Sequence, residues 1–376
     1  MGRAMRFGIF VSTAGRQSAG PETYETCLVR EMLALDRENE YHVFCLNEAA
    51  RRSFGIEQDN LAYHVLWPDN RWVSTLTSLP LGIRRTGVDL LHATVVAPPV
   101  SPQEYVFTMH CFSSFVRPEL YPARIRVPLN SLILRGLRRS RLSLCVSGVV
   151  RDLVAERWGI PVEKMRVVHN GAGAEFRPVP DEEARATVRE RYGIRDPYLL
   201  FVGQLKARKN VIRIVEAFAR ARAELGLPEL KLVLAGRRIW SAEGIDEAIA
   251  AQGVRDHVVE LGHLALADLP ALYSAARLFV FPSLWEGFGI PVIEAMACGV
   301  PVLTSNVSAL PEVAGGAALL VDPHRSDDIA EGIVRALRDG DLREELRRKG
   351  FERASQMTWR ETARNTLAAY HEALGL

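Results

Sequence analysis

Short apolar runs alternate with longer amphipathic segments, and this alternation constrains the fold more than any other feature of the sequence. The first run, residues 6–11 (RFGIFV), precedes a segment at 22–39 in which apolar residues recur at helical spacing. That apolar face consists of Cys27, Leu28, Met32, Leu33 and Leu35. Further apolar runs follow at 41–46, 62–67, 89–94, 105–110 and 142–147. Strands separated by helices in this rhythm predict a doubly wound α/β domain on a parallel sheet.

The same pattern starts again near residue 197 and predicts a second α/β domain. Predicted strands lie at 197–205, 230–236, 257–264, 278–283 and 301–306, and predicted helices at 213–225, 266–276 and 290–299. A chain of 376 residues suits two domains of roughly 150–200 residues each. The turn-forming, charged stretch 170–186 indicates the linker. The last helical pattern, 358–375, has no strand after it. We therefore expect domains at 1–175, with 358–376 returning to it, and at 176–357.

The composition is that of a soluble globular enzyme, with 48% hydrophobic and 24% charged residues. A net charge of +2 gives no global field for binding nucleic acid. No apolar run approaches the roughly 18–20 residues that span a bilayer, and the amino terminus lacks signal-peptide features. The five cysteines lack a CxxC pair and are odd in number, which favours a reduced, cytoplasmic protein.

Two glutamates, Glu286 and Glu294, flank a glycine-containing loop in the segment 281–306. Pro291 suits the first turn of a short helix, so Glu286 falls in the loop and Glu294 in that helix. The backbone amides of the preceding residues would lie at the helix's positive end, which suits a diphosphate; these residues are Phe288, Gly289 and Ile290. An ionised carboxylate can accept hydrogen bonds from two vicinal hydroxyls. Alternatively, Glu294 only complements the helix dipole and Glu286 is a solvated loop charge.

A basic stretch at 202–210 (VGQLKARKN) follows a predicted strand and precedes a helix. Arg208 and Lys209 would lie at the carboxyl end of that strand, where open α/β sheets bind ligands. Cations there would neutralise a diphosphate and stabilise it as a leaving group. The alternative is a solvated basic turn.

In the first half, two histidines end predicted strands, His92 and His110, and Gly20 lies in the loop after the first strand. That loop is not GxGxxG, so a dinucleotide-binding oxidoreductase is a poor interpretation. The chain has no HxxxH, and we predict no metal site. Six arginines and no acid occupy 124–144. This basic amphipathic segment suits either an anionic membrane surface or a packed helix with a solvated face.

Assembled in this way, the motifs resemble those of the retaining glycosyltransferases of family 4, which have the GT-B fold of two facing Rossmann-like domains. The resemblance is strongest over 282–323, where Glu286 and Glu294 match the Glu-x7-Glu signature. The stretch 201–210 matches the phosphate-binding strand and loop, 169–178 the linker, and 357–374 the returning helix. The first half matches more loosely.

The resemblance implies a role for each matching residue. Glu294 would bind the ribose hydroxyls, and Glu286 the donor-sugar hydroxyls. The amides of Phe288, Gly289 and Ile290 would touch the sugar and β-phosphate, with Arg208 and Lys209 neutralising the diphosphate. Gly20 would let its loop approach the phosphates, and His110 would lie near the sugar and the acceptor hydroxyl. The base would lie near Gly236 and His263.

These roles imply transfer of a hexose from a nucleotide diphosphate sugar to an acceptor hydroxyl, with retention, without metal and without a permanently bound cofactor. The sequence of residues 272–299 resembles that of bacterial mannosyltransferases of polysaccharide and O-antigen assembly. GDP-mannose is therefore the expected donor, and a UDP-sugar is the alternative. The acceptor would be a glycan or lipid-linked glycan at the inner face of the plasma membrane, with 124–144 touching the membrane. Alternatives of another class are a sugar-nucleotide epimerase and a non-catalytic nucleotide-sugar-binding protein.

Overall fold

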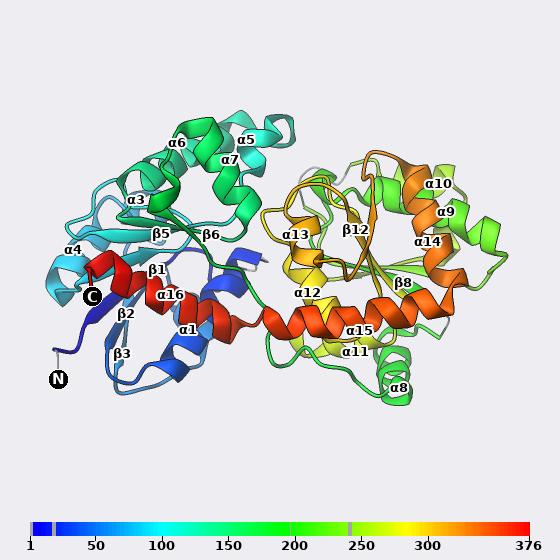
Figure 1. Ribbon diagram of the computed structural model, residues 1–376, viewed down its shortest axis with the longest axis horizontal. Coiled ribbons are helices and arrows are strands. Elements are labelled where there is room, and N and C mark those ends of the chain that lie inside the picture. Colours follow the sequence, from blue (N-terminus) through cyan, green and yellow to red (C-terminus); the bar gives the residue numbers. More distant parts are fainter. Residues whose placement is uncertain (1–2, 17–19, 196, 240–242) are drawn as a thin grey trace. The chain divides into compact units, whose positions relative to one another are not determined.

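The computed structural model describes residues 3–16, 20–195, 197–239 and 243–376. The chain divides into two compact units, each with one parallel β-sheet covered by helices (Figure 1). Unit 1 comprises Met1–Asn170 and Trp359–Leu376, and unit 2 comprises Gly171–Thr358. The predicted fold class is confirmed, including the C-terminal helix that returns to the first domain.

Unit 1 contains a seven-stranded sheet in the order β3-β2-β1-β4-β5-β6-β7. Its strands are β1 (Arg6–Val11), β2 (Glu40–Cys45), β3 (Leu61–Val65), β4 (Leu90–Ala93), β5 (Tyr105–Met109), β6 (Leu142–Cys145) and β7 (Met165–Val167). Its helices are α1 (Gly20–Leu35), α2 (Glu48–Phe54), α3 (Arg71–Ser74), α4 (Ser78–Thr86), α5 (Ser113–Val116), α6 (Ala123–Arg139), α7 (Gly148–Trp158) and α16 (Trp359–Leu374). Helices α1 and α16 pack together on one face, while α4, α6 and α7 cover the other (Figure 1).

Unit 2 contains a six-stranded sheet in the order β10-β9-β8-β11-β12-β13. Its strands are β8 (Tyr198–Val202), β9 (Lys231–Ala235), β10 (Val258–Gly262), β11 (Leu278–Phe281), β12 (Val302–Ser305) and β13 (Leu319–Val321). Its helices are α8 (Asp181–Tyr192), α9 (Val211–Leu225), α10 (Ile245–Ala251), α11 (Leu269–Ser274), α12 (Ile290–Ala297), α13 (Leu310–Ala314), α14 (Ser326–Arg338) and α15 (Gly340–Gln356). The central strands are buried on both faces, which explains their unbroken apolar sequences.

The strand order locates one switch point in each sheet. In unit 1 the chain reverses direction across the sheet between β1 and β4, and in unit 2 between β8 and β11. Open α/β sheets bind ligands outside the carboxyl ends of the strands at such points. Loops 12–16 and 203–210, which follow β1 and β8, therefore occupy the favoured positions.

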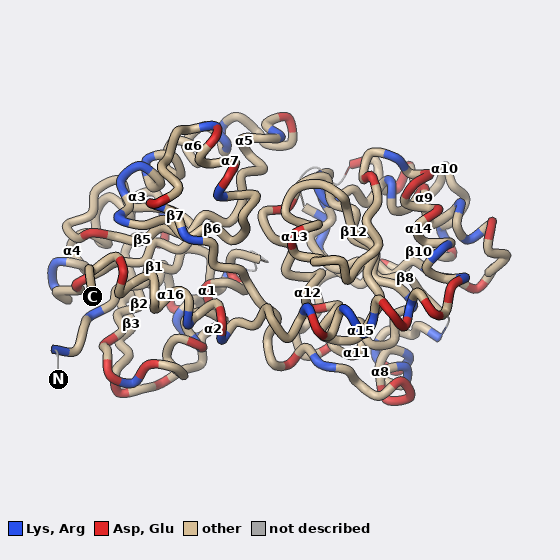
Figure 2. The backbone as a smooth tube through the Cα atoms, in the orientation of Figure 1, with Lys and Arg blue, Asp and Glu red and all other residues tan. Residues whose placement is uncertain are grey.

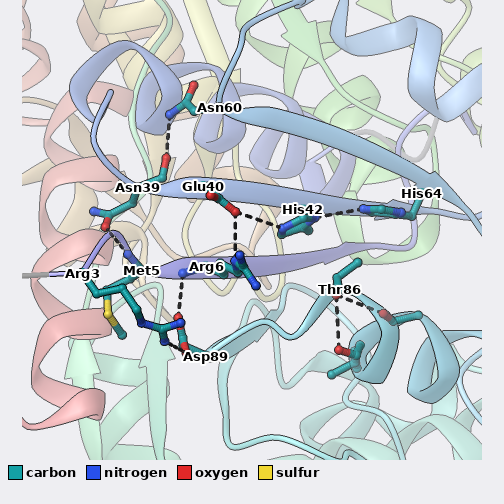
Figure 3. Close-up of polar contacts among 12 residues, drawn as sticks. Arg3, Met5, Arg6, Asn39, Glu40, His42, Asn60, His64, Thr86 and Asp89 are labelled. Carbon is teal, nitrogen blue, oxygen red and sulfur yellow. Dashed lines mark hydrogen bonds and ion pairs between the residues drawn. The ribbon is translucent and has the colours of Figure 1, made fainter.

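The opposite, amino-terminal edge of the unit 1 sheet is joined by polar contacts (Figure 3). The backbone N–H of Arg6 donates to Asp89 at 2.8 Å, and its side chain donates to Glu40 at 3.0 Å. Further along the strands, His42 of β2 and His64 of β3 share a hydrogen bond of 3.0 Å. These contacts fix the strand register, which pairs Arg6 with Glu40, away from the switch point.

The predicted helices differ by a few residues in their bounds from those in the structure, and α1 and the arginine-rich segment are two examples. Helix α1 ends at Leu35 because the Asp36 carboxylate accepts from the backbone N–H groups of Glu38 and Asn39, forming a turn that competes with the helix. The arginine-rich segment 124–144 is helical only to Arg139, and β6 begins at Leu142.

The returning helix α16 is tied to the core of unit 1. Its Tyr370 hydroxyl lies 2.7 Å from Nδ1 of His92, a fully buried residue of β4. His92 Nε2 contacts Thr108 Oγ1 at 2.6 Å. Burial, and then the proximity of His110, lowers the pKa of His92 to about 3, so this imidazole is neutral. His92 is therefore a structural residue that connects α16 to the sheet.

Candidate active site

The unit 2 switch point is built by two glycines that let adjacent strand ends approach closely. The Gly203 N–H donates to the carbonyl of Ala235 at 2.8 Å, just beyond β8. A Cβ on Gly236 would lie 1.8 Å from the Gly203 carbonyl oxygen, so only glycine fits there. The resemblance to family 4 implies that the base lies near Gly236. The structure gives Gly236 a packing role at the same place, and the base contact stays a prediction.

Glu286 forms a buried ion cluster with Arg208 and Lys209, which we call the Glu286 cluster. Oε2 of Glu286 lies 2.7 Å from Arg208 Nη1, and Oε1 lies 2.7 Å from Lys209 Nζ. The three side chains are only 9–11% exposed. Burial alone would raise the pKa of Glu286, but the two cations outweigh it and lower the pKa to about 2. The solvated-charge interpretation of all three residues is therefore wrong.

The Glu286 cluster is assembled from the loops after neighbouring strands β8 and β11. Arg208 also donates to the carbonyl of Trp285, and the Leu284 N–H donates to the carbonyl of Arg208 at 2.9 Å. The Lys209 ammonium lies 4.2 Å from the ring centroid of Phe281, a cation–π contact. With one ionised carboxylate and two cations, the cluster keeps one net positive charge.

Glu294 lies in α12 and is held differently. It is 7% exposed, and its Oε2 accepts from the Tyr273 hydroxyl at 3.1 Å. Burial raises the pKa of Glu294 to about 7, and the hydrogen bond from Tyr273 only partly opposes the shift. The two glutamates of one sequence motif thus have opposite ionisation behaviour.

The loop between the two glutamates leads directly into α12. Gly289 has φ +110° and precedes Ile290, the first helical residue, while Phe288 is 3% exposed. A Cβ on Gly289 would lie 2.7 Å from Leu310 Cδ2, so glycine is required by space as well as by φ. Helix α12 starts as predicted, and its N-terminus carries the partial positive charge that favours anions.

Two supporting residues of this site were not predicted. Asn210 has φ +64°, and its amide donates to the carbonyls of Pro282 and Pro323 at 2.9 and 2.7 Å, joining the loops after β8, β11 and β13. Ser308 has φ +59°, and its Oγ accepts from the Glu286 N–H at 3.1 Å. Asparagine favours left-handed backbone, so the Lys-Asn pair before α9 was a usable signal, whereas Ser308 offered none.

His110 follows β5 at the carboxyl edge of unit 1. Its Nε2 lies 2.7 Å from the carbonyl oxygen of Thr94. A carbonyl only accepts, so Nε2 carries the proton and Nδ1 carries the lone pair. The Tyr24 ring stands edge-on at a centroid distance of 4.4 Å. Burial lowers the pKa of His110 to about 4, so the imidazole is neutral near pH 7.

The remaining predicted residues lie at the same two edges. Gly20 is the first residue of α1, and His263 is an exposed residue that directly follows β10. The loop after β1 is already hydrogen-bonded internally, because the Gly15 N–H donates to Glu22 Oε1 at 2.8 Å. Within the described ranges, no group of three or more His, Cys, Asp or Glu side chains could hold a metal ion.

The arginines of 124–144 lie along α6 and just beyond it (Figure 2). The second half of α6 buries Ile133, Gly136 and Leu137, whereas Ile125 and Val127 in its first half are 38% and 58% exposed. In the described part of the chain, no helix has both the length and the apolar character needed to cross a membrane.

Sequence comparisons identify the family to which the chain belongs. Residues 185–353 match the profile described as "Glycosyl transferases group 1", and residues 19–176 match "Glycosyltransferase Family 4". "O-antigen chain mannosyltransferase B" of Escherichia coli is 33% identical over 70% of this chain and 69% of that protein. The chain belongs to glycosyltransferase family 4. It is therefore an enzyme of the glycosyltransferase class.

Two further comparisons define the extent of this family relationship. "Serotype-specific mannosyltransferase WbdA" of Escherichia coli is 30% identical over 64% of this glycosyltransferase, which spans only 30% of that longer protein. The solved structure of a sucrose-phosphate synthase from Thermosynechococcus elongatus covers 99% of both chains with a TM-score of 0.80. At 21% identity, that likeness shows the GT-B fold alone.

Proposed function

We propose that this glycosyltransferase moves a hexose from a nucleotide diphosphate sugar to a glycan hydroxyl, with retention and without a metal. Unit 2 would bind the donor and unit 1 the acceptor. The observation that carries the proposal is the Glu286 cluster, because a buried, preorganised pair of cations at a sheet switch point suits a diphosphate. The remaining positive charge of this cluster, together with the N-terminus of α12, would neutralise the diphosphate in place of a divalent cation.

The ionisation of Glu286 supports direct attack by the acceptor. A carboxylate whose pKa is about 2 and which is held by two cations is a weak base and a weak nucleophile. Glu286 would therefore orient donor-sugar hydroxyls. We propose that the acceptor hydroxyl attacks from the face that the phosphate leaves and that the phosphate takes its proton.

His110 would face the sugar and the acceptor hydroxyl from unit 1. Its neutral imidazole, with the proton held on Nε2, leaves the Nδ1 lone pair to accept a hydrogen bond from a sugar hydroxyl, while the departing phosphate takes the proton of the acceptor. Because this imidazole carries no charge, it would not attract a second phosphate to the position of the acceptor hydroxyl.

Glu294 would bind the ribose diol of the donor. Both hydroxyls need an acceptor, so binding would favour the ionised carboxylate. The amides of Phe288, Gly289 and Ile290 would contact the sugar and β-phosphate, and the base would lie near Gly236 and His263. Gly20 would let its loop approach the phosphates.

GDP-mannose is the proposed donor because the two E. coli relatives are mannosyltransferases. A UDP-sugar is the alternative. The proposed acceptor is a glycan or lipid-linked glycan of a bacterial surface polysaccharide. The exposed Ile125 and Val127 beside the arginines of 124–144 support contact with the inner face of an anionic membrane.

The deciding experiment is calorimetry of the purified protein with GDP, UDP, ADP, dTDP and their sugars, with and without EDTA. We expect tight, EDTA-insensitive binding of GDP and GDP-mannose, followed by release of GDP only when acceptor is added. Binding of none of these nucleotides would overturn the proposal. Loss of binding on adding EDTA would overturn the metal-independent mechanism, and tighter binding of UDP would replace the donor.

A further inference from the structure

Glu25 is a fully buried carboxylate in unit 1 that the proposed mechanism does not use. It lies in the second turn of α1 and is 0% exposed. An ionisable group buried in this way is costly unless its oxygens are hydrogen-bonded. Its side chain extends beneath the loop that follows β1, at the switch point of the unit 1 sheet.

Five donors converge on the two oxygens of Glu25. Oε1 accepts from the Ser12 N–H at 2.8 Å and from Thr94 Oγ1 at 2.6 Å. Oε2 accepts from the Thr13 N–H at 2.9 Å, from Thr13 Oγ1 at 2.7 Å and from the Ala14 N–H at 2.8 Å. We call Glu25 and its four partner residues the Glu25 network; the partners are Ser12, Thr13, Ala14 and Thr94. These contacts hold both oxygens of Glu25, and Thr94 Oγ1 also lies 2.8 Å from the Phe10 carbonyl oxygen. Burial raises the pKa of Glu25, and the hydrogen bonds only partly oppose that shift.

The loop after β1 therefore has the form of a backbone anion site whose N–H groups are occupied by a side chain of the same protein. Successive N–H groups that point to one place form concavities that bind phosphate and other anions. Here the N–H groups of Ser12, Thr13 and Ala14 are used by Glu25, and that of Gly15 by Glu22. A ligand phosphate would have to displace a carboxylate to use these amides.

The Glu25 network extends to His110 through a single residue. Thr94 Oγ1 lies 2.6 Å from Glu25 Oε1, and the Thr94 carbonyl accepts from His110 Nε2 at 2.7 Å. Thr94 is 0% exposed. Holding the Thr94 side chain therefore holds the carbonyl that sets the position and tautomer of His110.

We propose that Glu25 is a positioning residue for the transfer reaction. Glu25 occupies the backbone N–H groups of the loop after β1, which would line the acceptor position. It also keeps His110 oriented through Thr94. This inference rests on the proposed function for its effect on the reaction, but its effect on His110 can be measured without any turnover.

The test compares Glu25→Gln with Glu31→Gln, a half-buried acid on the same helix that takes no part in the Glu25 network. In Glu25→Gln one acceptor oxygen becomes an amide donor that faces other donors. We expect kcat at saturating substrates to fall about tenfold or more, the Kd of GDP to stay within about twofold, and the 15N shifts of the His110 imidazole to change. We expect Glu31→Gln to change none of these.

Two results would overturn the inference. One is a folded Glu25→Gln protein with wild-type kcat. The other is an unchanged His110 spectrum in that variant. If Glu25→Gln does not fold, Thr94→Val decides the matter, because it removes the hydroxyl donor but keeps the side-chain shape. It should lower kcat and alter the His110 shifts, and an unaltered spectrum overturns the inference.

The proposed function fails in a distinguishable way. It fails if the wild-type protein neither binds nucleotide nor transfers sugar, and the His110 spectra of the variants then still test the positioning role of Glu25.

Discussion

At the switch point of unit 2, Glu286 is held by two side-chain cations, whereas at that of unit 1, Glu25 is held by backbone N–H groups and hydroxyls. The first arrangement keeps a positive charge, because two cations face one carboxylate whose pKa is lowered. In the second no side-chain cation is among the partners of the carboxyl group, and burial raises the pKa of Glu25. Two sheets of the same architecture thus differ in their electrostatic surroundings at equivalent places. This difference supports the proposal that the diphosphate binds to unit 2 and the acceptor hydroxyl to unit 1.

The largest expected effect comes from removing the cations of unit 2. Lys209→Ala and Arg208→Ala should each lower the transfer rate by roughly 10²–10³, because each loses charge stabilisation of the departing diphosphate. Steady-state kinetics with the donor at saturation measure this. Arg220→Ala is the matched control, since Arg220 forms an exposed ion pair with Asp327. Equal losses in Arg220→Ala would mean that global charge, and not the Glu286 cluster, matters.

The next effect concerns stability and the raised pKa of Glu294. The native state binds a proton on Glu294 between about pH 4.5 and 7 that the unfolded chain releases, so this residue's contribution to stability falls as pH rises through that window. Glu294→Gln should therefore raise the unfolding free energy by about 3 kcal/mol at pH 8 and by less than about 1 kcal/mol near pH 5. Chemical denaturation at both pH values tests this. An equal increase in the unfolding free energy at pH 5 would contradict the raised pKa of Glu294 as the cause.

Donor affinity should follow the same ionisation in the opposite direction. If the ribose diol requires ionised Glu294, the Kd of the nucleotide sugar should decrease about tenfold from pH 6 to pH 8. The intact nucleotide sugar is the ligand of choice, because the terminal phosphate of a free nucleotide itself ionises near pH 6. Glu294→Gln should bind weakly with a flat profile. A profile that keeps its slope in this variant would remove Glu294 from the ribose site.

The smallest effect tests the contact between α16 and the core of unit 1. Tyr370→Phe removes the hydroxyl that meets His92 Nδ1 and should cost about 1 kcal/mol of stability, through the lost hydrogen bond in the core of unit 1. The activity of the folded enzyme should be unchanged, as shown by specific activity normalised to folded protein. A large loss of activity would mean that His92 is more than structural.

Much of this site was available from the sequence because its motifs are local. The strand, loop and helix around Glu286 and Glu294 are predicted by the apolar run, by the positions of the glycines and by Pro291. Helix α12 begins where these features predict it. The basic loop before α9 was likewise placed at a strand end. In contrast, the helical pattern over 22–39 ran past the real end of α1, because the Asp36 turn competes through side-chain hydrogen bonds that periodicity does not report.

What the sequence by itself determined about this glycosyltransferase is therefore its architecture, its family and the identities of the charged residues at the strand ends. Which charges meet was decided only by the tertiary structure. Arg208 and Glu286 are far apart in sequence and touch because β8 and β11 are neighbours in the sheet. Glu25 meets Thr94 because β1 lies beside β4. The ionisation of Glu286 and Glu294 differs for the same reason, since a pKa depends on burial and on partners brought together by strand order.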